Sequence, residues 1–241
     1  MKKLVMISGC GHTGTTLLAR MMGVHSKIYN PPFETNIFLA YNSLKWKYLI
    51  ESLYKEAKRE KKDYKVLLEK TPRHIWHIDF VRRKLPETKF ILMTRNGRDV
   101  IASLYERYND IEASIRRYKD DSLLTIRQID DNKVFLLRYE DLIENPEKCL
   151  KEIMTFVGLK FESSMLNFHQ TKVSWFKLDE IKKNSREDGV SHNNFRNWQV
   201  NQPIFKSSKT WKERIPKKKW IDLENFFEEE GNKIMNTLGY P

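Results

Sequence analysis

The stretch from Leu4 to Leu18, LVMISGCGHTGTTLL, constrains the fold more than any other part of the chain. Its first four residues form an apolar run that is typical of a buried parallel strand. Residues 8–14 are small or turn-prone, and the pattern that follows predicts a helix from Thr15. A strand, a glycine loop and a helix in this order bring backbone N–H groups around a phosphate at the positive end of the helix dipole. The segment is therefore predicted to bind an anionic group.

The glycine spacing narrows the choice of anion. Gly9, Gly14 and Thr16 match the nucleotide-binding pattern G-x-x-x-x-G-K-[ST], but Thr15 occupies the position of the lysine. Kinases and NTPases of this type place that lysine on the β- and γ-phosphates, so its absence argues against triphosphate chemistry. The simplest alternative is an ordinary strand–turn–helix with no ligand. The Gly-Thr-Thr run instead resembles the 5′-phosphosulfate loop of sulfotransferases, which use 3′-phosphoadenosine 5′-phosphosulfate (PAPS).

Length and charge set wider limits. The 241 residues are enough for one substantial α/β domain, and 40% apolar content is compatible with a packed core. The net charge of +12 suits an anionic ligand, although nucleic acid or a membrane surface would fit it equally well. Much of the excess lies in residues 55–65 and 217–219, where a solvated helix face is the simpler explanation.

The cysteines and the first apolar run bear on location. Cys10 and Cys149 form neither a disulfide framework nor a zinc-binding spacing, which favours a reducing compartment. The apolar run after Met1 is too short for a signal sequence or a transmembrane helix. These features predict a cytoplasmic protein.

The pattern along the chain predicts an α/β fold, a single domain with a central parallel sheet flanked by helices. After the first strand, further strands are expected at 27–30, 65–69, 88–94 and 133–137. The expected helices, besides the one that starts at Thr15 and one after residue 99, are 36–62, 72–85, 111–129, 146–157 and a C-terminal helix through 220–235. The pattern weakens between about 160 and 207, where an acceptor-side segment or lid is predicted.

Two charged residues follow predicted strands at the edge where parallel sheets bind ligands. Glu34 is a candidate general base for an acceptor hydroxyl, with a simple helix cap as the alternative. Lys70 is placed to offset charge on a moving group or a leaving phosphate. His74 and His77 are alternative bases, although a histidine on a helix surface usually has no such role.

The fourth strand is followed by Arg95, and Ser103 comes eight residues later in the following helix. A P-loop kinase usually ends a strand in an aspartate that holds magnesium, and no predicted strand does so here. The planar arginine fork suits a phosphate. The run RNGRDVIAS is similar to the 3′-phosphate motif of sulfotransferases. The Gly-Thr-Thr loop and this run occur in the same order as in sulfotransferases, and the two together indicate that family more specifically than either one alone.

The resemblance to PAPS-dependent sulfotransferases extends from residue 4 to the C-terminus, and in motif style it is closest to the tyrosylprotein and heparan or carbohydrate enzymes. It implies a P-loop NTPase-like sulfotransferase fold. It also implies a 3′-phosphate site at Arg95 and Ser103 and an adenine contact at Tyr139, in the run RYEDL, where Glu140 and Asp141 are taken as helix caps. The remaining nucleotide contacts that it implies are Gly11, His12, Thr13, Gly14, Thr15 and Thr16 around the 5′-phosphosulfate, and Ser208 and Lys209 before Trp211.

One position departs from the family pattern. His12 stands two residues before Gly14, where related loops usually carry lysine or arginine. A protonated His12 would donate to the bridging oxygen, whereas a neutral one would supply less charge. The division of this work between His12 and Lys70 is left open, and activity is expected to be more sensitive to pH than with arginine at residue 12.

These features together predict a PAPS-dependent sulfotransferase that releases PAP, the 3′,5′-bisphosphate of adenosine, with no metal required. The acceptor is a hydroxyl or, less readily, an amine on a small molecule, a carbohydrate or a peptide. Neither nucleic acid nor a membrane is expected as a partner. Two alternatives remain, a P-loop nucleotide kinase-like phosphotransferase and a non-catalytic basic module that binds anions.

Overall fold

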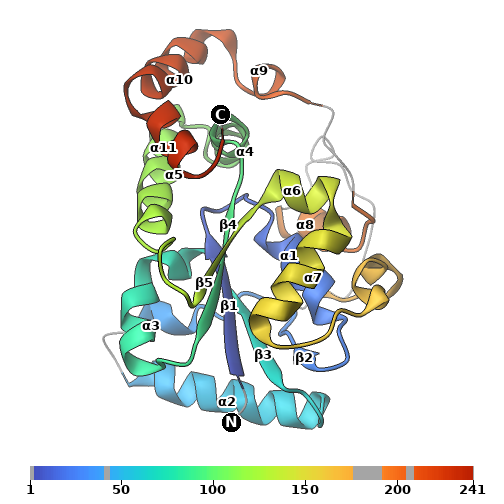
Figure 1. The fold of residues 1–241 in the computed structure, drawn as a ribbon. Coiled ribbons are helices and arrows are strands. Elements are labelled where there is room, and N and C mark those ends of the chain that lie inside the picture. Colours follow the sequence, from blue (N-terminus) through green and yellow to red (C-terminus); the bar gives the residue numbers. More distant parts are fainter. Residues whose placement is uncertain (1–2, 41–43, 176–191, 205–208, 241) are drawn as a thin grey trace.

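Five strands form one parallel sheet in the computed structural model, which describes residues 3–40, 44–175, 192–204 and 209–240. The strands are β1 (Lys3–Gly9), β2 (Ile28–Tyr29), β3 (Val66–Lys70), β4 (Lys89–Thr94) and β5 (Val134–Arg138). Their order across the sheet is β2-β3-β1-β4-β5, so β1 lies in the middle between β3 and β4. The chain therefore builds outward on both sides of its first strand (Figure 1).

Apolar side chains alternate between the two faces of the sheet. Val5 and Ile7 of β1 face one layer of the core, whereas Leu4 and Met6 face the other. Because both faces are covered, the strands read as continuous apolar runs rather than as alternating ones. Each fully buried Ile, Leu, Val or Met side chain contributes about 1.5–3 kcal/mol relative to an exposed one.

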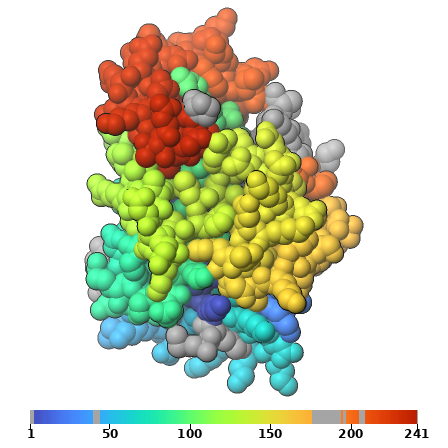
Figure 2. Space-filling view, in the orientation of Figure 1, coloured from blue at the N-terminus to red at the C-terminus, as the bar shows by residue number. Residues whose placement is uncertain are grey.

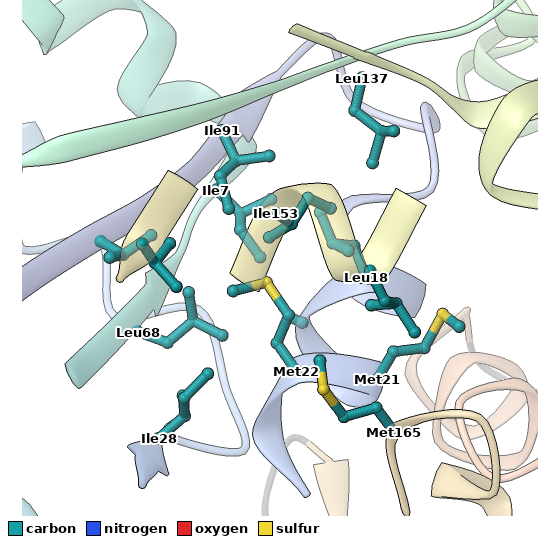
Figure 3. Close-up of a cluster of buried hydrophobic side chains, with 14 of the residues drawn as sticks. Ile7, Leu18, Met21, Met22, Ile28, Leu68, Ile91, Leu137, Ile153 and Met165 are labelled. Carbon is teal, nitrogen blue, oxygen red and sulfur yellow. The ribbon is translucent and has the colours of Figure 1, made fainter. Parts of the chain in front are cut away.

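The first face is covered by α1 (Thr15–Gly23) and α7 (Pro146–Val157). Leu18, Met21 and Met22 of α1 meet Ile153 of α7 over the strand residues (Figure 3). The described part of residues 160–204, which includes α8 (His192–Gln199), extends this layer through Met165 and Trp175.

The second face is covered by α2 (Lys45–Glu60) and α3 (Ile78–Lys84). The buried residues of α2 are Trp46, Ile50, Leu53 and Ala57. This spacing of three or four places one apolar stripe against the sheet and leaves the lysine-rich face outside.

A third cluster joins the C-terminal helices to the rest of the domain. It packs α4 (Gly97–Tyr108) and α5 (Ile111–Ile126) against α10 (Trp220–Phe226) and α11 (Asn232–Thr237), the last two separated by a π-helical turn at Phe227–Gly231. Figure 1 shows α10 and α11 in red at one end of the molecule, next to α4 and α5 in green, and the same red end is visible in Figure 2. Short α-helices also lie at α6 (Tyr139–Glu144) and α9 (Trp211–Arg214).

The predicted parallel sheet flanked by helices is confirmed, and the strand limits agree within one or two residues. The helix expected at 111–129 ends at Ile126, and two other helix predictions were wrong in where the helix begins. The described part of 36–62 consists of a 3-10 turn at Ile37–Ala40 and then α2, and the expected helix 72–85 begins as a 3-10 turn at Pro72–His77 before α3. Among the described residues no helix has the length and apolar content needed to cross a membrane.

Candidate active site

The ends of four neighbouring strands bring the candidate residues to one edge of the sheet. Lys70 ends β3 beside β1, and its register partner on β1 is Ile7. Gly9 pairs with Met93 of β4, and Thr94 pairs with Arg138 of β5. The loop after β1 therefore lies between Lys70 on one side and Arg95 on the other, at the position where open parallel sheets bind ligands.

The loop between β1 and α1 has a backbone that few sequences adopt. Gly9 has a φ of 133°, and a Cβ added there would lie 2.4 Å from the carbonyl oxygen of Met93. His12 has a φ of 70°, in the left-handed region, and Gly14 has a φ of 89°. The Thr13 hydroxyl donates to the carbonyl of Cys10 at 2.7 Å and closes the turn from within.

The loop delivers the first turn of α1 with its backbone donors available for a ligand. Gly14 is the N-cap residue and provides no side-chain cap, and the first turn of α1 contains no acidic residue. Thr15 is buried, Thr16 is half-buried, and a Cβ at Gly11 would meet nothing within 4 Å. An uncapped helix N-terminus of this kind attracts anions through its N–H groups and its dipole.

Arg95 lies on the ring of Tyr139, with its guanidinium carbon 4.6 Å from the ring centroid. Its Nη1 donates to the carbonyl of His12 at 3.5 Å, and its Nη2 lies 3.7 Å from Asp99 Oδ2. Its Nε is buried and has no hydrogen-bond partner within the described ranges. A Cβ at Gly14 would lie 2.5 Å from Tyr139 Cδ2, so the loop, the tyrosine and the arginine are in close contact.

Ser103 lies on α4, two turns after Arg95, and reaches the same loop. Its hydroxyl is 2.8 Å from His12 Nδ1, so the structure brings Ser103, Arg95 and His12 together. The helix that carries Ser103 is capped by Asn96, whose side chain accepts a hydrogen bond from the Arg98 N–H. The cap fixes the direction in which α4 leaves β4.

Glu34 and Lys70 form an ion pair on the other side of the loop. Lys70 Nζ donates to Glu34 Oε1 at 2.7 Å. The Lys70 side chain is fully buried, whereas that of Glu34 is 34% exposed, so of the two partners only Glu34 is accessible to solvent. Trp175 is also buried and lies with its ring centroid 5.3 Å from Lys70 Nζ. The indole ring of Trp175 thus contacts the lysine.

His74 is not the surface histidine that the sequence suggested. It is fully buried, with Nδ1 2.8 Å from Glu69 Oε2 and Nε2 accepting the Phe38 N–H at 3.3 Å. Both ring nitrogens are engaged, which argues against a role as base. His77 is half-buried, and burial together with the charges of His74 and Arg73 lowers its pKa.

Glu140, interpreted from sequence as a helix cap, has a different role. Its Oε1 accepts the backbone N–H of Asn96 at 3.0 Å, and its Oε2 accepts the hydroxyl of Tyr240 at 2.8 Å. It therefore ties the turn after Arg95 to the C-terminal residues. No local pattern could reveal this contact, because the partners are distant in sequence.

Three other residues that the sequence singled out are Cys10, Ser208 and Lys209. Burial, reinforced by the negative charge of Asp121, raises the pKa of the Cys10 thiol well above its usual value, so this loop cysteine stays protonated. Lys209 is exposed just before the capping box of α9, formed by Thr210 and Glu213. Ser208 lies outside the described residues. Within the described ranges, no cluster of three or more His, Cys, Asp or Glu residues is arranged to hold a metal.

Arg20 of α1 holds the segment predicted as a lid. Its guanidinium is buried and donates to the carbonyls of Val200, Phe168 and Thr171 at 3.1, 3.2 and 2.6 Å. Burial lowers the pKa of Arg20 to about 10, a value at which the side chain is still charged at neutral pH. Arg20 thereby joins α1 to chain segments on both sides of Trp175, at Phe168 and Thr171 before it and at Val200 after it. That this segment opens as a lid stays a prediction.

Comparisons with known proteins agree on one family. Residues 38–163 match the model described as the sulfotransferase family, and residues 114–234 match that of the sulfotransferase domain. An uncharacterised protein of Aquifex aeolicus is 21% identical over 82% of this chain and 30% of its own length. A Caenorhabditis briggsae protein named "Putative protein-tyrosine sulfotransferase" is 29% identical over 43% of this chain and 41% of its own length.

This chain thus spans less than half the length of both relatives. A mouse sulfotransferase solved in complex with PAP has the same fold, with a TM-score of 0.58 and 16% identity. The match covers 98% of this chain and 88% of the mouse chain.

Proposed function

Because this chain belongs to the sulfotransferase family, we propose that it transfers the sulfuryl group of PAPS to a hydroxyl or, less readily, an amine of an acceptor. The observation that carries this proposal is the arrangement around the loop after β1. Arg95 and Ser103 contact the loop from the β4 side, and the Glu34–Lys70 pair lies at the end of β3 on the other side. The complex of the mouse neighbour with PAP supports the choice of donor.

The donor nucleotide would occupy the β4 side of the site. The N–H groups of residues 11–16 and the Thr15 and Thr16 hydroxyls would bind the 5′-phosphosulfate at the start of α1. Arg95 and Ser103 would bind the 3′-phosphate, for which the buried Nε of Arg95 offers a donor. Tyr139 already supports the Arg95 guanidinium, and its ring edge would contact the adenine.

The acceptor would be activated by Glu34. As the acceptor oxygen forms its bond to sulfur, Glu34 takes the hydroxyl proton, and the bond from sulfur to the bridging oxygen breaks to release PAP. Lys70 and His12 would offset the charge that builds on the departing phosphate. General-base and electrostatic assistance contribute roughly 10²- to 10³-fold each. The half-exposed Glu34 carboxylate over a buried lysine suits a group that must meet an acceptor from solvent.

The test is a pair of matched glutamate variants assayed for PAPS-dependent sulfation. A panel of acceptors would include a tyrosyl peptide, a phenol and sulfatable sugars. Glu34→Gln should lower kcat by roughly 10²- to 10³-fold while leaving PAP affinity within about twofold, because the carboxylate acts on the acceptor. Glu87→Gln is the control, since Glu87 also pairs with a lysine, Lys133, but on the surface away from the loop. Full activity in Glu34→Gln would contradict the assigned role of Glu34.

A further inference from the structure

The last two residues of β3 project to opposite faces of the sheet. Leu68 of β3 belongs to the core beneath α1 and α7, and Leu67 belongs to the core on the α2 side. Strand alternation places Lys70 on the first side, where it meets Trp175, and Glu69 on the second, where it meets His74. The end of β3 thus presents a lysine to one layer and a carboxylate to the other.

The segment that carries Glu34 contacts both of these side chains. Glu34 pairs with Lys70 on one face, and the next residue, Thr35, donates its hydroxyl to Glu69 Oε1 at 2.7 Å on the other. The same oxygen accepts the Thr71 hydroxyl at 2.6 Å. Glu34 therefore binds Lys70, and its neighbour Thr35 binds Glu69, the residue before Lys70.

Glu69 is also the end point of two further contacts to this segment. The Phe38 N–H lies 3.3 Å from His74 Nε2, and His74 Nδ1 lies 2.8 Å from Glu69 Oε2. The Asn36 N–H donates to the hydroxyl of Thr71, itself a donor to Glu69. Each contact reaches residues 35–38 through a group that Glu69 binds.

The charge on Glu69 is held in place by these donors. The side chain is fully buried, and burial alone would raise its pKa. The attraction of His74 and the hydrogen bonds from His74, Thr71 and Thr35 together hold that pKa below its usual value. Glu69 is therefore an ionised acceptor for three donors, and its own carboxylate is closed to solvent.

We propose that Glu69 is a positioning residue for sulfuryl transfer, which sets the Glu34 carboxylate against Lys70 by holding the neighbours of both, Thr35 and Thr71. The inference rests on the proposed function of Glu34 and Lys70. A network that only stabilised the fold would lower stability without changing turnover per folded molecule. A positioning network changes turnover, because a misplacement of about 1 Å at a reacting group costs about 100-fold.

Two substitutions separate these outcomes. Glu69→Gln keeps the shape but exchanges one acceptor oxygen for a donor, and Thr35→Val removes only the hydroxyl that ties the Glu34 segment to Glu69. Each is expected to lower kcat by about 10-fold or more, with the KM for PAPS and the affinity for PAP within about twofold. Ser114→Ala is the control, because it removes a buried hydroxyl bonded to the Asp110 carbonyl on α5. Its kcat should equal that of the wild type.

A double-mutant cycle with Glu34 measures whether the effect of Glu69 on turnover depends on Glu34. A purely structural role of Glu69 would show no such dependence. In the Glu34→Gln background, Glu69→Gln should cause less than about twofold further loss of turnover, because the group that it positions is already inactive. Losses that multiply instead would overturn the proposal, as would an unchanged kcat in both single variants. If Glu69→Gln does not fold, Thr35→Val decides the question by itself.

Hydrogen exchange tests the anchor without any acceptor. Amides of residues 33–40 should exchange about tenfold faster in Glu69→Gln than in the wild type, while those of α4 stay unchanged. Equal exchange in residues 33–40 would overturn the anchoring role even if no acceptor had been found. A wild-type protein that neither binds PAP nor transfers sulfate would refute the proposed function, and the exchange result would still stand separately.

Discussion

Gly14 offers the sharpest test of the loop geometry. Its φ of 89° lies in the region that favours glycine, and a Cβ there would lie 2.5 Å from Cδ2 and 3.0 Å from Cε2 of Tyr139. The substitution Gly14→Ala should therefore strain the loop and push the tyrosine ring away. Since Arg95 lies on that ring, the arginine should move with it.

The loss of stability expected in Gly14→Ala is the sum of two free-energy costs. A left-handed conformation costs a residue with a Cβ about 1–2 kcal/mol, and overpacking of a tight contact costs about 1–3 kcal/mol. The free energy of unfolding should therefore fall by about 2–5 kcal/mol. For a domain of this size each kcal/mol shifts the melting temperature by about 2–4 °C, so a decrease on the order of 10 °C is expected.

The assay pairs Gly14→Ala with Gly11→Ala in the same loop. A Cβ at Gly11 meets nothing within 4 Å, so Gly11→Ala should melt within about 2 °C of the wild type. PAP affinity, measured by calorimetry well below the melting temperatures, should fall at least about tenfold in Gly14→Ala because Arg95 is displaced. Wild-type stability and wild-type PAP affinity in Gly14→Ala would refute the assigned contact between loop, tyrosine and arginine.

Three further results are expected. Arg95→Ala should weaken PAP binding about 10- to 100-fold, as expected for the loss of a charged hydrogen bond, but leave adenosine 5′-monophosphate binding unchanged in calorimetry; equal losses would argue against a 3′-phosphate contact. Glu140→Ala should lower unfolding free energy in urea by about 1–3 kcal/mol, because the Asn96 N–H and the Tyr240 hydroxyl lose their acceptor; an unshifted midpoint would contradict this. Because the folded-state pKa of Glu69 lies below the usual 4.5, its ionised form stabilises the protein above that pH and the contribution disappears as the pH falls through the folded value. The stability gap between wild type and Glu69→Gln should thus be constant near neutral pH and shrink in acid, and a gap independent of pH would show that Glu69 is not the titrating group.

Local sequence signals were sufficient for the sheet and the glycine loop. The apolar runs that became β1 and β4, and the glycines that allow the turn after β1, act through nearest neighbours and through burial on both faces. The end of α7 could also be predicted from sequence, because a glycine, Gly158, occupies the left-handed position that ends the helix.

The wrong start of the helix predicted at 36–62 and the missed contacts have a common cause. Residues 34–38 are held by Glu69, Thr71 and His74, and these tertiary contacts override the helical pattern that begins near Asn36. Asn36 itself has a φ of 53°, which no helix interior accepts. Such contacts join residues more than 30 positions apart, so the sequence could suggest Glu34 and Lys70 but not the network behind them.

The most direct test of the central claim is the thermal stability of the purified protein with PAP, compared with ATP and magnesium. PAP at 100 times its Kd should stabilise the fold by about 2.7 kcal/mol, which corresponds to a rise in Tm of about 5–10 °C. ATP with magnesium should leave the Tm unchanged, because Thr15 replaces the lysine that binds the β- and γ-phosphates. A rise in Tm with ATP and magnesium, and none with PAP, would contradict the proposed donor site.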